Sequence, residues 1–204
     1  MKKLLLVSAA CVFASAAAIA DPADQPGHQS PAPGTSNDSM SAVKDTAGHV
    51  VGDASAEMTT SLKGFVAAAA TSDMYEVAAG KIAQDRSQNP KVRMFAEKMV
   101  KAHTETTDKL KALLASGHGD VTPPMHLDDR RQGMIDELRG AKDTDFDSRY
   151  IAQQIDAHKE ALILLKGYAK DGDVTSIRHF AAQTAPVVRS HLTMAESIEK
   201  QLNR

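Results

Sequence analysis

Hydrophobic and polar positions follow a helical period over most of the chain beyond residue 57. Apolar residues recur at alternating spacings of three and four. This pattern predicts four long helices, at about 61–86, 90–115, 143–170 and 174–202. Asn89 and Pro90 suit the start of the second helix, and Pro186 should kink the fourth. We therefore expect an all-helical domain over residues 57–204.

Two short turns and one long connection join these segments. The turns, near residues 88 and 172, are so short that the helices on either side must pack antiparallel. The connection at 116–142 is long enough to cross a bundle, and its LDDRRQGMIDELR stretch predicts a short helix. Two antiparallel hairpins joined by one long crossover predict a ferritin-like four-helix bundle.

The first 56 residues lack this pattern. Residues 1–20, MKKLLLVSAACVFASAAAIA, place two lysines before an apolar run that ends in small residues, which is typical of a secretory signal peptide. Residues 21–56 are rich in Pro, Ser and Gly and predict a flexible leader. We expect an exported, periplasmic protein, with secretion as an alternative, and no transmembrane helix in the mature chain.

Cys11 is the single cysteine of the chain. It is either an ordinary residue of the signal peptide or the lipidated first residue of a lipoprotein. The preceding SAA lacks the leucine usually found three positions before a lipidated cysteine, which favours the first interpretation. Cleavage after Ala20 would leave no thiol for disulfides, metal ligation or catalysis.

The charge balance of the chain argues against a nucleic-acid partner. The chain has 24 Lys and Arg against 26 Asp and Glu, a formal net charge of −2. No basic stretch interleaved with aromatic residues stands out, so we expect no nucleic-acid binding. The sequence identifies no other partner, although export suggests association with the cell envelope.

Each long helix carries a polar side chain on its apolar face. His103 stands in FAEKMVKAHTE, residues 95–105, on the face formed by Val92, Ala96 and Met99. The same test selects further polar residues on apolar faces, namely Glu76, Gln154, His158 and His191. Counted from the turns near 88 and 172, Glu76, His103, His158 and His191 lie 12, 15, 14 and 19 residues away, which predicts one shared layer.

Three imidazoles and a carboxylate from four helices suit Zn, Cu or Fe. We therefore predict that Glu76, His103, His158 and His191 bind one transition-metal ion, and that Gln154, one turn before His158, orients a ring as an outer partner. The competing interpretation is a structural layer in which buried histidines and a glutamate satisfy one another and fix the helix register.

An enzymatic role is not indicated. Di-iron bundles use Glu-x-x-His on two helices, but Val100, Ile155 and Val188 precede the three histidines at that offset, so a di-metal oxidase is a distant third hypothesis. No Gly-rich phosphate loop, serine-nucleophile motif or HExxH pattern is present, and we predict no catalytic residue. The remaining histidines are expected to be solvated, namely His28, His49, His118, His126 and His179.

Three stretches resemble a known family. They read SDMYEVAAGKIAQDRSQNPKVRMFAEKMVKAHT, then FDSRYIAQQIDAHKEALILLKGYAKDG, then IRHFAAQTAPVVRSHLTMAESI. Over about residues 61–202 the chain is similar to the exported bacterial proteins grouped as domain of unknown function 4142 (DUF4142), often labelled outer-membrane proteins. Glu76, His103, His158 and His191 fall where that family's pattern has them. The resemblance implies a ferritin-like fold and transfers no established activity.

One position departs from the family pattern. Ala102 stands where the family commonly has an aspartate before the histidine. If that aspartate orients the ring, His103 is expected to be less well held in this chain.

Overall fold

The structure is a computed structural model that describes residues 59–204. This part of the chain contains five helices and no strand. The helices are α2 (Leu62–Arg86), α3 (Pro90–Ala115), α4 (Asp129–Gly140), α5 (Asp143–Asp171) and α6 (Thr175–Leu202). The predicted all-helical class and the four long helices are confirmed, with ends within about one residue of those expected. The predicted signal peptide and leader lie outside the described residues.

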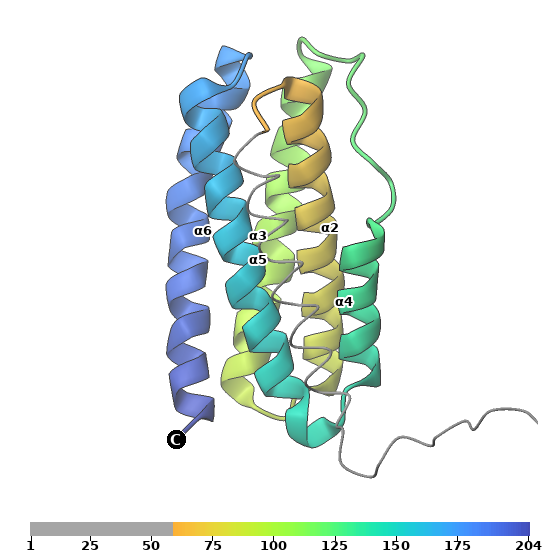
Figure 1. Cartoon of the computed structure of the whole chain (residues 1–204), viewed down its shortest axis with the longest axis vertical. Helices are drawn as coiled ribbons and strands as arrows, with labels where there is room; N and C mark the ends of the chain where they lie inside the picture. The colour runs from red at the N-terminus through yellow and green to blue at the C-terminus, as the bar shows by residue number, and fades with distance from the viewer. Residues whose placement is uncertain (1–58) are drawn as a thin grey trace, which may run out of the picture. The chain divides into compact units, whose positions relative to one another are not determined.

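The four long helices lie side by side (Figure 1). Helix α2 packs against α3 and α5, and α6 packs against the same two helices, so the four enclose one interior. The chain leaves α3 at one end, returns along the outside and enters α5 at the other end, as the long connection predicts. Helix α4, part of this connection, packs on the outside against α2 and α5.

Local sequence sets the helix starts. The side chain of Asn89 accepts a hydrogen bond from Lys91 N at 2.9 Å, and Pro90 opens α3, where a missing N–H costs nothing. Ser61 caps α2 and Asp128 caps α4 in the same manner. Pro186 lies inside α6, which continues through it. The sequence thus identified the start of α3 from its capping residues.

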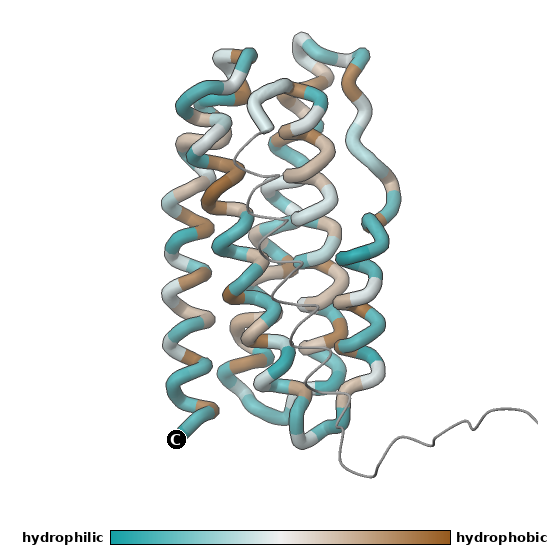
Figure 2. Tube along the Cα trace, in the orientation of Figure 1, coloured by the Kyte–Doolittle hydropathy of each residue, from teal (hydrophilic) through white to brown (hydrophobic). Residues whose placement is uncertain are grey.

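The apolar interior is divided into two clusters along the bundle. One includes Met99, Ile155 and Ala195, and the other includes Leu110, Leu162 and Val188. Hydrophobic residues recur along every long helix on both sides of this division (Figure 2). The three predicted histidines lie between the two clusters on α3, α5 and α6, so a buried polar layer separates the two apolar regions.

Helix α4 is attached by both charged and apolar contacts. Arg130 donates two hydrogen bonds to the carboxylate of Glu160 on α5, at 2.8 and 2.6 Å, and a nitrogen of Arg131 lies 3.6 Å from the same group. Glu160 is only 5% exposed, so its charge needs this partner. Ile135 and Leu138 add the apolar contact that fixes the position of α4.

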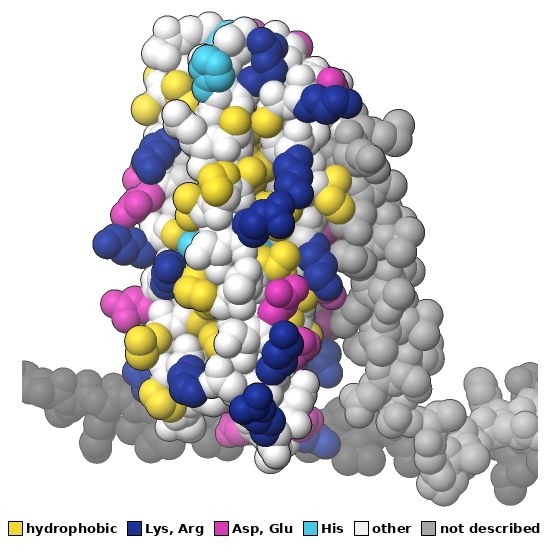
Figure 3. Space-filling model, turned by 90° about the vertical axis from the view of Figure 1, so that its left-hand side faces the viewer, with side chains coloured by type: hydrophobic (Ala, Val, Ile, Leu, Met, Phe, Trp, Pro, Cys, Tyr) yellow, Lys and Arg dark blue, Asp and Glu magenta, His cyan; other side chains and the backbone are white. Residues whose placement is uncertain are grey.

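On the face shown in Figure 3, Lys and Arg side chains are interspersed with acidic and small hydrophobic ones. Among residues 59–204, no helix combines the length and the apolar character that a membrane crossing requires.

Helices α2 and α3 approach closely at Gly80, one turn after Glu76. A Cβ atom at this position would lie 2.7 Å from a methyl group of Val100 and 3.1 Å from the carbonyl oxygen of Ala96. We expect Gly80→Ala to lower the free energy of unfolding by roughly 1–2 kcal/mol, because this overpacking outweighs the better helix propensity of alanine. Denaturant melts measure the change.

Gly133 on α4 provides the matched control, because a Cβ there would meet nothing within 4 Å. Gly133→Ala should therefore leave stability unchanged or raise it by up to about 1 kcal/mol. Equal effects from the two substitutions would contradict a close approach at Gly80.

Candidate metal centre

Three histidines meet in the interior of the bundle. His103 comes from α3, His158 from α5 and His191 from α6, and each offers a ring nitrogen within 4.8 Å of those of the other two. The ring centroids are 5.6 to 5.9 Å apart. All three side chains are buried, at 5%, 0% and 2% exposed. The structure thus brings together the three histidines that the sequence selected.

In each ring a nitrogen is left without a partner. His103 Nδ1 donates to Asp73 Oδ1 at 2.7 Å, and His158 Nδ1 donates to the backbone carbonyl of Gln154 at 2.7 Å. The other nitrogens of these rings, together with Nδ1 of His191, are buried and have no hydrogen-bond partner. Donating one N–H to an outer acceptor fixes the tautomer and leaves the other nitrogen free to bind a metal.

Glu76 lies beside the three rings, but its carboxylate is not among the donor atoms that lie within 4.8 Å of one another. Its Oε1 lies 3.6 Å from His158 Nδ1, the nitrogen already bonded to Gln154. Its Oε2 is buried and has no hydrogen-bond partner. Glu76 is 1% exposed, so its carboxylate adds a potential negative charge beside the rings rather than a fourth converging donor.

Burial sets the protonation of this cluster. Removal from water, helped by the charge of His103, lowers the pKa of His158 to about 3 and that of His191 to about 4. Burial alone would lower the pKa of His103 too, but the hydrogen bond to Asp73 and the charge of Glu76 outweigh it and raise this pKa. Two of the three rings are therefore neutral at pH 7, the state that binds metal ions.

Burial also raises the pKa of Glu76 from 4.5 to about 7. Because the folded-state pKa lies above the unfolded one, the stability that goes with a protonated Glu76 is present below pH 4.5 and lost as the pH rises through 7. For the metal-free protein we expect Glu76→Gln to be more stable than the wild type by on the order of 2 kcal/mol at about pH 8, and equal at about pH 4. Urea melts at the two pH values measure this, and equal stability at both would contradict a buried ionisable Glu76.

Asp73 was missed by the sequence analysis, although it lies one turn before Glu76 on the same side of α2. The sequence analysis considered only polar residues that stand in the apolar stripe of a helix. Asp73 lies at the edge of that stripe, so its burial was not predicted. Asp73 is 5% exposed, and besides binding His103 it accepts a hydrogen bond from Thr107 Oγ1 at 3.1 Å. The expectation that Ala102 leaves His103 less well held is therefore wrong, because the carboxylate of Asp73 on α2 holds the ring instead.

Asp73→Asn is expected to weaken metal binding by about 10- to 100-fold, because loss of an outer carboxylate usually has an effect of this size. The helical content should stay unchanged, since asparagine has nearly the same shape. Competition titrations with a chromophoric chelator measure the affinity. Asp108→Asn, an exposed aspartate on α3, is the control and should bind like the wild type.

The predicted outer partner Gln154 acts through its backbone. Its carbonyl oxygen accepts the His158 bond, whereas its side-chain amide atoms are buried and have no hydrogen-bond partner. The hydroxyl of Tyr150, one turn earlier, is likewise buried and without a partner. Of the histidines predicted to be solvated, His126 and His179 are exposed, His118 is half-buried, and His28 and His49 lie outside the described residues.

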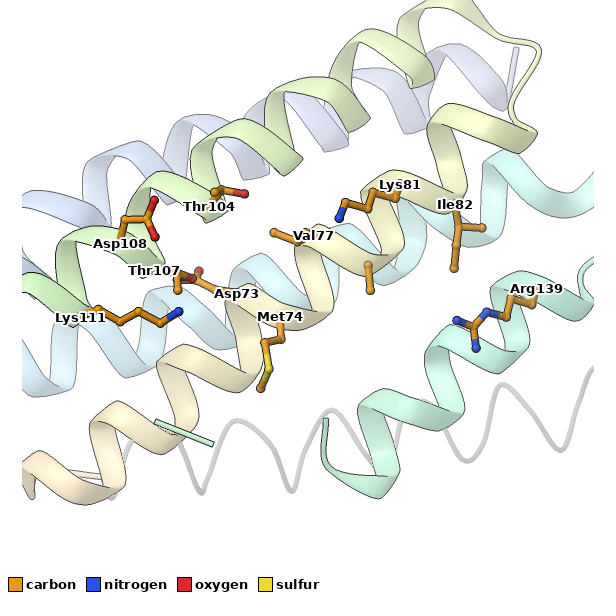
Figure 4. Close-up of a pocket in the computed structure, with 11 residues that line it drawn as sticks. Asp73, Met74, Val77, Lys81, Ile82, Thr104, Thr107, Asp108, Lys111 and Arg139 are labelled. Atoms are coloured by element: carbon orange, nitrogen blue, oxygen red, sulfur yellow. The ribbon is translucent and has the colours of Figure 1, made fainter. Parts of the chain in front are cut away.

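A surface groove of about 520 Å³ lies next to Asp73, the hydrogen-bond partner of His103 (Figure 4). It runs between α2 and α3 toward the end of α4, and Asp73 lines it together with Thr107. Figure 4 shows these two side chains next to each other, with Lys111 nearby. Asp73 therefore lies between the groove and His103.

The donor set suits a borderline metal ion. Imidazole nitrogens bind Zn, Cu and Fe, and three of them from separate helices leave further coordination positions for another ligand. The buried nitrogens without partners are the observation that fits such an ion, because buried polar atoms are otherwise nearly always hydrogen-bonded.

Comparison with known proteins supports the fold and the family. No curated protein matches the chain. The crystal structure of a DUF305 fragment from Deinococcus radiodurans is similar in fold, with a TM-score of 0.60 and 14% sequence identity over 68% of this chain and 95% of that one. The family described as "Domain of unknown function (DUF4142)" has a model that matches residues 49–198. The chain, with its buried histidines inside the matched segment, belongs to the DUF4142 family.

Proposed function

We propose that this protein is an exported, ferritin-like helical bundle that binds one transition-metal ion through His103, His158 and His191. Its role is to bind or buffer Zn, Cu or Fe in the periplasm, without turnover of a substrate. The paths of the helices support the ferritin-like assignment, since two antiparallel pairs are joined by a connection that runs the length of the bundle.

One observation carries the proposal. Three histidines that are far apart in the sequence place ring nitrogens within 4.8 Å of one another, in the interior, where a nitrogen of each ring has no hydrogen-bond partner. A buried polar atom without a partner costs about 1–3 kcal/mol, and the costs of three such nitrogens, one on each ring, add together. A bound ion would satisfy all of them at once.

The test is the metal content of the protein purified from its native envelope without added metal. Elemental mass spectrometry should find close to one transition-metal ion per chain and identify it, and the mass of the N-terminus should show cleavage after Ala20. Metal-free protein that also takes up no Zn²⁺, Cu²⁺ or Fe²⁺ in dialysis would overturn the proposal.

The alternative is an envelope interaction protein with a purely structural polar layer. The hydrogen bonds from His103 to Asp73 and from His158 to Gln154 favour it, since they fix ring positions without any metal. It predicts metal-free protein that melts cooperatively and is unaffected by chelators. A di-metal oxidase has less support, because Val100, Ile155 and Val188 are aliphatic where that centre needs carboxylates.

A further inference from the structure

A small cavity adjoins His103, one of the three clustered histidines. Its volume is about 30 Å³, and His103 and Asp73 form part of its wall. The remaining wall comes from the helical turns next to the histidine layer, with Ser72 on α2, Thr106 on α3 and Thr184 on α6. These residues place the cavity on the side of the layer that faces the turn between α5 and α6.

The size of the cavity limits what it can hold. A space of about 10–15 Å³ is enough for one water molecule, so 30 Å³ accommodates a ligand of one or two non-hydrogen atoms and little more. A larger substrate would have to displace core side chains, which are close-packed in protein interiors.

The chemistry of the wall favours a neutral ligand. Most of it is apolar, with Ala69, Leu165 and Phe180 among its members. Thr106 and Thr184 donate their hydroxyl protons to carbonyl oxygens of their own helices, at 2.9 and 2.8 Å. Asp73, the one carboxylate in the wall, would repel an anion.

The number of protein donors also favours a site that takes an added ligand. The three rings supply three nitrogens, and Glu76 lies against a nitrogen that is already hydrogen-bonded instead of converging with the others. A structural zinc site has four protein ligands, whereas an open site has three and leaves a position for an exogenous molecule. A cavity beside His103 provides space for that molecule.

We propose that the cavity bounded by Ser72, Thr106 and Thr184 is the pocket for an exogenous ligand of the metal ion, a water molecule that a neutral diatomic gas can replace. This inference rests on the proposed metal site. It makes the centre an open one, able to bind a small gas, rather than a sealed structural site.

A route from solvent supports this assignment. Asp73 lines both the external groove of about 520 Å³ and the internal cavity. Thr107, which donates to Asp73, lines the groove beside it. Asp73 is the one residue that lines both, so a rotation of its side chain is the motion that would connect the groove to the cavity.

Nitric oxide is the probe, because it is neutral and has two non-hydrogen atoms. The full-length protein is loaded anaerobically with Fe²⁺, or with Co²⁺ if Fe²⁺ is not retained, and bound metal is measured first. Electron paramagnetic resonance then reports binding, since nitric oxide creates a half-integer-spin signal on high-spin Fe²⁺ and removes the signal of high-spin Co²⁺. We expect a response close to one nitric oxide per bound ion.

Ser72→Val fills the cavity and should lower the response per bound ion at least tenfold while metal content stays the same. Ala69→Val, from the neighbouring turn of α2, is a second filling variant in case Ser72→Val folds poorly. Ser176→Val is the matched control, because it makes the same exchange at an exposed position of α6 outside the cavity and should keep the full response.

Two failures are distinguishable. Metal bound near one per chain with no response to nitric oxide in the wild type would overturn this inference and leave the proposed metal site intact, as would an undiminished response in both filling variants. Protein that binds none of the metals tested would overturn the proposed function and this inference with it.

Discussion

His158→Ala is expected to lower the affinity for the metal ion by about a hundredfold or more. His158 is fully buried and lies 5.6 Å, centroid to centroid, from each of the other two rings. The free energy of metal binding in structural zinc sites, roughly 10–16 kcal/mol over four ligands, gives about 3 kcal/mol per ligand, and each 1.4 kcal/mol is a factor of ten. Competition with a chromophoric chelator, at fixed pH, measures the affinity.

His179→Ala is the matched control for this substitution. His179 is an exposed histidine on α6, and its loss should leave the affinity within about twofold of the wild type. His191→Ala should repeat the loss seen with His158→Ala, because its ring supplies an equivalent nitrogen. If a folded His158→Ala bundle binds metal as well as the His179→Ala control, the three rings are not the site.

Saturating metal is expected to raise the melting temperature of the wild type by about 10 °C. A ligand that binds only the folded state, at a thousand times its dissociation constant, stabilises it by about 4 kcal/mol. For a domain of this length each kcal/mol corresponds to roughly 2–4 °C. Melting followed by circular dichroism, with and without added metal, measures the shift.

The His158→Ala variant tells specific binding from general effects of metal ions on the protein. In that variant the same metal concentration should move the melting temperature by about 5 °C or less, since a hundredfold weaker affinity leaves about 1.4 kcal/mol of stabilisation. A chelator should return the wild type to its metal-free melting temperature. Equal shifts in the two proteins would mean that the stabilisation comes from elsewhere on the chain.

Much of the fold follows from local signals in the sequence. Helical periodicity gave the four long helices, and Asn89 with Pro90 marked the start of α3 to the residue. The three histidines could be predicted because each occupies an apolar position of its helix, and because short turns fix how far into the bundle each position lies. These are properties of single helices and of their lengths.

The features of the site that the sequence did not predict depend on contacts between helices. Asp73 holds His103 from another helix, and no local pattern says which carboxylate faces which ring. Glu76 was grouped with the histidines by depth, yet its side chain reaches the nitrogen of His158 that is already used. Gln154 binds His158 through its backbone carbonyl, which a side-chain argument could not anticipate.

The three histidines are contributed by both helical pairs, since His103 belongs to the first and His158 and His191 to the second. Neither pair alone can therefore bring all three ring nitrogens together, and the cluster forms only when the two pairs dock. A metal ion bound by all three rings would therefore be captured only after the two pairs have docked. On the proposed function, the identity of that ion would be set by the ions available where the chain completes its fold, and not by those present where it is synthesised.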